Sequence, residues 1–110
     1  MSLETRRWMR LMVFFDLPVT SPAKKRNYQV FRNFLLKDGY DMLQWSVYAR
    51  LCNGQDAASK HYRRLLGHLP PEGSVRCMEI TEKQFVAMRH LVGAPSPQEK
   101  TVNCEQLLLF

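Results

Sequence analysis

Residues 11–18, with the sequence LMVFFDLP, decide the fold of this chain. The first five are apolar, and the run then meets Asp16 and Pro18, residue types that favour a turn. A short, continuously apolar segment with this kind of ending is typical of a β-strand whose two faces are both buried. We therefore predict a central strand over residues 11–15 that enters a turn at Asp16.

A first amphipathic helix is predicted directly after this strand, over residues 23–37. Ser21 can cap its N-terminus, and Pro22 suits the first helical position because the N–H group it lacks has no partner there. The helix is expected to end near Gly39. Four apolar side chains share one face of this helix: Tyr28, Phe31, Phe34 and Leu35.

The rest of the chain predicts two more strands, a second helix and a fourth strand. Residues 40–51 are rich in β-forming side chains and predict two strands with a reversal near residues 44–46. Asn53-Gly54 opens a second helix that stops at Pro70-Pro71. Residues 74–80 predict a further strand, and Thr81 a cap for a short helix over residues 82–90. The second helix repeats apolar residues at helical spacing: Ala58, Tyr62, Leu65 and Leu69.

This order of elements predicts an α+β fold of the ferredoxin-like βαββαβ type, with both helices on one face of an antiparallel sheet. We expect one domain over residues 1–110, with a core at about residues 10–80 and a C-terminal extension over 81–110. Because the first strand is apolar on both faces, a second copy of the chain is the simplest cover for the other face. The apolar tail is expected to add a strand to the partner's sheet in a homodimer. That tail comprises Leu107, Leu108, Leu109 and Phe110.

The charge balance favours a polyanionic partner. Lys and Arg total 16 against 10 Asp and Glu, a formal net charge of +6, which favours nucleic acid, with solubility alone as the alternative. Two helical groups would form a positive track along a duplex backbone if they lay on the same side of the sheet, although each group alone is more often a solvated helix face. The first group is Lys24, Lys25, Arg26 and Arg32, and the second is Lys60, Arg63 and Arg64.

Other function classes are disfavoured. The five glycines form no phosphate-binding loop, which argues against a nucleotide-binding enzyme. Three widely spaced cysteines without a Cys-x-x-Cys pair predict free thiols and a cytoplasmic location. No apolar run approaches the roughly 20 residues of a membrane span, and no export signal is predicted. The histidines His61, His68 and His90 are expected to be surface or partly packed residues.

Asp16 is the candidate catalytic and metal-binding residue. An aspartate at a strand end is often only a turn residue. In a dimer that joins the first strands, however, two Asp16 carboxylates would approach across the two-fold axis. Oxygen ligands suit Mg²⁺ or Mn²⁺, and such an ion can activate water against a phosphodiester.

Four motifs carry a resemblance to a known family. They are FFDLP at residues 14–18, the basic helix with its spaced aromatic residues at 28–35, QWSVY at 44–48 and TEKQF at 81–85. In this order they resemble the smaller of the two universal CRISPR spacer-acquisition proteins, the CRISPR-associated endoribonuclease family, and most closely its type II members. The resemblance runs from about residue 10 to residue 110.

The resemblance implies a homodimer, completed by its C-terminal strands, that bridges two dimers of the larger CRISPR integrase and supports prespacer duplex DNA. It also implies a metal-dependent endonuclease activity that varies among members, on RNA or DNA, with Asp16 as the ligand of Mg²⁺ or Mn²⁺. Tyr48 stands where the family often has phenylalanine, which is a mild departure.

Two alternatives remain on the same strand order. One is a toxin-like, metal-dependent endoribonuclease that acts without a partner. The other is an RNA-recognition domain, which we rank last because residues 47–51 lack the Lys/Arg-Gly-Phe/Tyr motif of that module.

Overall fold

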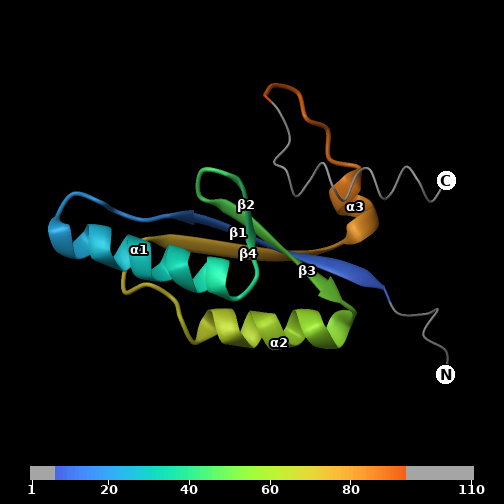
Figure 1. The fold of residues 1–110 in the computed structure, drawn as a ribbon, viewed down its shortest axis with the longest axis horizontal. Coiled ribbons are helices and arrows are strands. Elements are labelled where there is room, and N and C mark those ends of the chain that lie inside the picture. Colours follow the sequence, from blue (N-terminus) through green and yellow to red (C-terminus); the bar gives the residue numbers. More distant parts are fainter. Residues whose placement is uncertain (1–6, 94–110) are drawn as a thin grey trace.

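The structure is a computed structural model that describes residues 7–93 (Figure 1). Its strands pair antiparallel in the order β2-β3-β1-β4, and α1 and α2 cover one face of the sheet. This arrangement is the ferredoxin-like fold, so the predicted fold class is confirmed; the C-terminal strand lies outside the described residues. The elements are β1 Trp8–Asp16, α1 Pro22–Lys37, β2 Asp41–Gln44, β3 Val47–Asn53, α2 Gln55–Leu66, β4 Ser74–Thr81 and α3 Glu82–Val86.

The central strand β1 is longer than predicted and begins at Trp8. Successive side chains of a strand point to opposite faces. Leu11, Val13 and Phe15 pack in the helix-side core, whereas Met12 belongs to a second buried cluster on the opposite face. The prediction that both faces of this strand are buried is therefore confirmed over most of its length.

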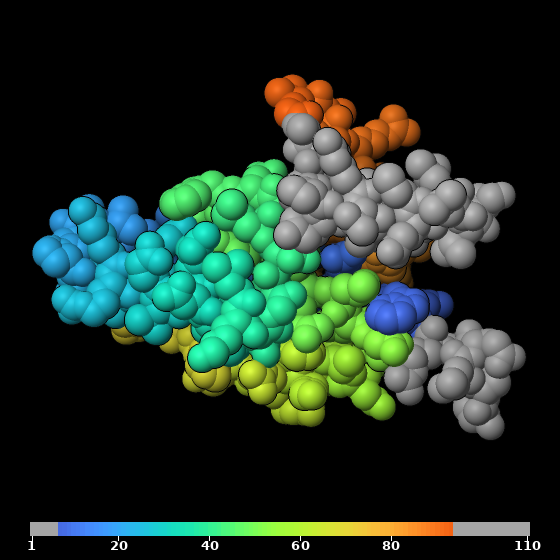
Figure 2. Space-filling view, viewed as in Figure 1, coloured from blue at the N-terminus to red at the C-terminus, as the bar shows by residue number. Residues whose placement is uncertain are grey.

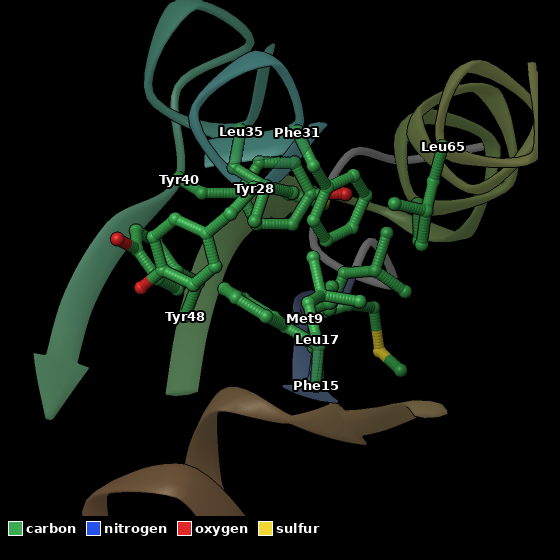
Figure 3. Packing of buried hydrophobic residues seen from close by; sticks show 13 residues of the cluster. Met9, Phe15, Leu17, Tyr28, Phe31, Leu35, Tyr40, Tyr48 and Leu65 are labelled. Carbon is green, nitrogen blue, oxygen red and sulfur yellow. The ribbon is translucent and has the colours of Figure 1, made fainter. Parts of the chain in front are cut away.

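Aromatic rings fill the core between the sheet and α1 (Figure 3). The Phe15 ring meets the Phe31 ring edge-on at 5.1 Å and stacks on the Tyr48 ring at 5.5 Å, arrangements that aromatic pairs favour. α1 begins where its local signals predict, because the Ser21 side chain accepts a hydrogen bond from the Lys24 backbone N–H at 3.2 Å. A local cap and an apolar face together place this helix.

The inward face of α2 differs from the predicted one. Tyr62 is 43% exposed, and Leu69, at 47% exposed, lies beyond the end of the helix at Leu66. His61 takes the inward position instead and is only 8% exposed, so its prediction as a surface or partly packed residue is wrong. The reason is tertiary: Asp38 supplies the hydrogen-bond partner that a buried imidazole needs.

Part of the second sheet face is covered by the chain itself, not only by a second copy as the sequence suggested. Phe85 of α3 packs over Met12 and is 4% exposed. The Arg10 guanidinium lies 4.3 Å from the Phe85 ring centroid and donates to Glu82 at 2.6 and 3.1 Å. A capping box begins α3 at Thr81, as predicted, but the helix ends at Val86 and does not reach His90.

The Arg10–Glu82 pair yields a stability prediction. Both side chains are nearly buried, and removing one partner leaves an uncompensated charge inside the protein. We expect Glu82→Gln to lower the free energy of unfolding by about 2 to 4 kcal/mol, because glutamine keeps an acceptor but loses the charge. Urea unfolding at fixed protein concentration measures this, with exposed Lys83→Gln on the same helix as the control. A decrease no larger than that of the control would contradict the assignment.

Candidate nucleic-acid interface

Asp16 is the last residue of β1 and is exposed. It pairs in register with Ser74 of β4 and shares the open sheet face with Phe14, because alternate residues of a strand point the same way. The Phe15 backbone N–H donates to the Ser46 carbonyl at 3.1 Å. The turn between β2 and β3 is therefore hydrogen-bonded to the end of β1. This bond fixes the position of the backbone beside Asp16.

Gly73 allows the chain to pass close to Asp16. Its φ is +101°, a conformation that side-chain-bearing residues rarely adopt. A Cβ atom there would lie 2.8 Å from the Asp16 carbonyl oxygen and 2.7 Å from Leu17 Cδ2. Glycine is thus required for β4 to enter the sheet beside the candidate carboxylate.

Residues 7–93 of one chain do not form a complete metal site around Asp16. Within residues 7–93 no cluster of three or more His, Cys, Asp or Glu side chains is arranged to hold a metal ion. The carboxylate has the oxygen chemistry that Mg²⁺ and Mn²⁺ prefer, but one such ligand is not a site. The predicted role of Asp16 as a metal ligand therefore requires ligands beyond those that residues 7–93 of one chain supply, and it stays a prediction.

The predicted basic residues lie on two helices that cover the same face of the sheet, as expected from the order of elements. Figure 2 shows α1, in cyan, and α2, in yellow-green, adjoining on one side of the molecule. Four of the seven cations are exposed and form no ion pair among the described residues, which leaves their charges free for a polyanion. These four are Lys25, Arg26, Lys60 and Arg63.

The other three predicted cations are engaged within the chain. Lys24 Nζ lies 3.8 Å from Glu72 in an exposed pair, which is weak in water. Arg64 Nε donates to Asp38 at 2.7 Å. Arg32 lies beside Tyr48 and partly offsets the effect of burial, which raises the pKa of that phenol. These residues can still attract phosphate, but their positions are set by protein contacts.

A buried cluster around Asp38 was not predicted from the sequence. The Asp38 carboxylate accepts from His61 Nδ1 at 2.9 Å and from Arg64, and its carbonyl accepts from Arg50 Nε at 2.8 Å. Charge-assisted hydrogen bonds of this kind are stronger than neutral ones. The cluster ties the C-terminal end of α1 to α2 and β3, so it fixes the two basic helices relative to each other. Local sequence gives no signal for it, because Asp38-Gly39 is typical of an ordinary helix end.

An apolar groove runs along the open face of the sheet. Its volume is about 850 Å³, and residues 87–92 form one of its sides. Met78 is half-exposed in this groove. Arg76, which was not predicted as a site residue, pairs in register with Phe14 on the same sheet face. The sheet contributes most of the apolar lining: Met12, Phe14, Leu43, Val47, Met78 and Ile80.

Comparison with known proteins identifies the family. The family model described as "CRISPR associated protein Cas2" matches residues 9–88, which span β1 to just beyond α3. The chain belongs to the Cas2 family. The strand-end aspartate and the basic helix α1 therefore lie inside the matched region, and a CRISPR-associated role follows. The likeness to type II members stays a prediction.

Relatives of this Cas2-family chain extend over nearly its whole length. The protein named "CRISPR-associated endoribonuclease Cas2" of Acidovorax ebreus is 63% identical over 102 residues, which cover 93% of this chain and 100% of that protein. The protein of the same name from Campylobacter jejuni is 42% identical, covering 94% of this chain and 73% of that protein. A solved structure titled "Crystal structure of cas2" aligns with a TM-score of 0.49 at 19% identity, covering 82% of this chain and 92% of that chain.

The two described cysteines of this Cas2-family chain are unsuited to thiolate chemistry. Cys52 and Cys77 are free, as predicted, and Cys104 lies outside the described residues. Burial raises the pKa of Cys77 to about 11 and also raises that of Cys52. A nucleophilic cysteine needs the opposite shift.

In residues 7–93 no helix is both long and apolar enough to cross a membrane.

Proposed function

We propose that this Cas2-family chain is a dimeric scaffold for CRISPR spacer acquisition, which binds prespacer duplex DNA through its helices and bridges dimers of the larger integrase. The observation that carries the proposal is the set of four exposed cations on two adjoining helices that form no ion pair within residues 7–93. Phosphate contacts of this kind give affinity without base recognition. A scaffold that accepts many different spacer sequences needs this property.

The occupant proposed for the apolar groove is a second copy of the chain. In a two-fold dimer the same patch lies on both subunits, so an apolar groove beside β1 can meet its own copy. The tail at 107–110, which lies outside the described residues, has the apolar composition of a strand that would pair with a partner's sheet. β4 is an edge strand of the described sheet and would accept such a strand.

A second candidate activity, metal-dependent endonuclease, is favoured by the location of Asp16. The carboxylate is exposed on the same open face that the proposed dimer uses. Two copies would then supply two oxygen ligands near one axis. Mg²⁺ or Mn²⁺ bound there would supply an activated water for phosphodiester cleavage. The two relatives described above are named as endoribonucleases, which supports RNA as one substrate.

The scaffold proposal is tested at the groove with Met78→Glu. A carboxylate placed there would be charged inside the apolar lining of both subunits, so we expect the dimer to weaken by about a hundredfold or more. Light scattering measures the oligomeric state, and a spacer-acquisition assay in cells that carry the integrase measures function. Met42→Glu is the matched control, because Met42 is exposed on β2 and pairs with Tyr48, on the other sheet face. A Met78→Glu protein that remains dimeric and still supports acquisition would overturn the proposal.

A further inference from the structure

Trp45 is an exposed aromatic residue that the proposed dimer leaves uncovered. Its side chain lies in the turn between β2 and β3 and is 72% exposed. The indole ring stacks on Tyr28 of α1, with ring centroids 5.6 Å apart and an interplanar angle of 18°. Tyr28 belongs to the helix-side core, so Trp45 lies on the side opposite the apolar groove. A second copy seated in that groove would therefore leave the indole accessible.

The stack on Tyr28 fixes the orientation of the indole. Tyr28 is itself only 6% exposed, and its ring lies 6.0 Å from that of Phe15. Trp45 therefore has one face against a rigid aromatic support and the other face free. A side chain that is already oriented loses little conformational entropy when it binds a ligand. The free face is a flat surface ready to receive another planar group.

The backbone of the turn is also fixed, at Ser46. Its φ of 63° is unusual for a residue with a side chain, and Ser46 is the only non-glycine residue with positive φ in residues 7–93. Residues hold such conformations only where their surroundings determine them, and they cluster at functional sites. Here the Ser46 carbonyl accepts the Phe15 N–H. The turn that presents Trp45 is thus bonded to the end of β1.

Cations flank the aromatic pair along α1. Lys24, Tyr28 and Arg32 are spaced four residues apart, so they form one row on the helix surface, and each cation lies about 6 Å along the axis from Tyr28. The Lys24 ammonium forms an exposed pair with Glu72, which phosphate can replace at little cost. The row places a positive charge on each side of the stacked rings.

We propose that Trp45 is a stacking platform for an unpaired nucleobase, with Lys24 and Arg32 placed to contact the phosphates on either side. The inference rests on the proposed nucleic-acid function and adds a preference for strands with unpaired bases. A base inside a duplex has both faces covered by its neighbours, and a blunt end exposes only the outer face of its terminal pair, so a single strand or an unpaired end offers the indole much more exposed base surface. An exposed aromatic residue flanked by cations fits single-stranded nucleic acid, which combines a stacking face with a charged backbone.

The test compares Trp45→Leu with Trp45→Phe on three fluorescent DNA probes. The probes are a single strand, a duplex with unpaired ends and the same duplex made blunt. Stacking on an aromatic residue contributes a factor of about five to 150 in affinity per base. We expect Trp45→Leu to lose that factor on the two probes with unpaired bases and to stay within about twofold on the blunt duplex. Trp45→Phe should keep most of the affinity, because phenylalanine also stacks.

The control is Trp8→Leu, since Trp8 is the half-exposed tryptophan at the opposite end of β1. In a Trp8→Phe protein, the remaining indole fluorescence should be quenched by the single strand and not by the blunt duplex; this measurement holds even if Trp45→Leu fails to fold. Equal weakening on all three probes, no weakening on any, or a defect in integrase binding alone would overturn the proposal. A wild-type protein that fails to bind blunt duplex but binds the single strand through Trp45 would instead contradict the proposed scaffold function.

Discussion

Reversing the four free cations, as Lys25→Glu, Arg26→Glu, Lys60→Glu and Arg63→Glu together, is expected to weaken duplex DNA binding by a factor of about four thousand at about 0.1 M salt. The physical reason is counterion release: each neutralised phosphate contributes a salt-dependent factor of roughly eight at this ionic strength. All four side chains are exposed and have no ion pair among the described residues. Their reversal should therefore leave the fold intact.

The measurement is the affinity for duplexes of unrelated sequence over a range of salt concentrations. The slope of log affinity against log salt should become shallower by about 0.9 for each phosphate that the variant no longer neutralises, and all sequences should be affected alike. A control reverses Lys83, an exposed cation of α3 that does not line the groove, and the two effects are compared per reversed charge. An equal effect in that control would show that net charge alone binds DNA, and a strongly sequence-dependent effect would show base recognition.

The sequence predicts the fold well where its signals are local. Ser21 and Pro22 mark the start of α1 through a cap and a fixed φ, and both act within one helical turn. The apolar run of β1 predicts its central place in the sheet. Because the order of strands and helices allows few connections, these local signals are enough to give the sheet order. The same reasoning places both basic helices on one face.

The sequence fails where a distant residue decides the outcome. Tyr62 and His61 are adjacent, and periodicity favours the apolar one, yet His61 is buried because Asp38, 23 positions earlier, accepts its hydrogen bond. The cover over Met12 depends on the pairing of Arg10 with Glu82, which lies 72 positions away. Neither contact is marked by a hydrophobic period or by a sequence motif, so a single sequence does not predict it.

The candidate site divides in the same way. Asp16 is marked by the turn signal that ends β1, so its exposed position at the strand end follows from the sequence. The ion pairs of Arg64 with Asp38 and of Lys24 with Glu72 do not follow from the sequence, since each pair joins separate segments. The stack of Trp45 on Tyr28 likewise joins a turn to a helix. The sequence thus predicts which residues form the candidate site and on which helix or strand each lies. Tertiary packing decides which of the cations form ion pairs within the chain and which remain exposed without one among the described residues.

Replacing Asp16 with asparagine is expected to abolish Mg²⁺- or Mn²⁺-dependent cleavage while leaving spacer acquisition intact. Asparagine keeps the size and one oxygen of the side chain but removes the negative charge that holds a divalent ion. Acquisition should survive because, in the proposed scaffold, the integrase performs the joining chemistry. Asp16 is also exposed, so the free energy of unfolding should change by less than about 0.5 kcal/mol.

Both activities are measured on the same purified variant: cleavage of single-stranded RNA and of duplex DNA with and without the metal, and acquisition in cells that supply the integrase. Asp56→Asn is the control, since Asp56 is an exposed acidic residue in the first turn of α2, on the helix side of the sheet. Cleavage that persists in Asp16→Asn at the wild-type rate would contradict a metal site at the strand end. Failure of acquisition in a variant that remains dimeric and still binds the integrase would contradict the scaffold proposal. Acquisition would then need the Asp16 carboxylate itself, and not only the assembled dimer.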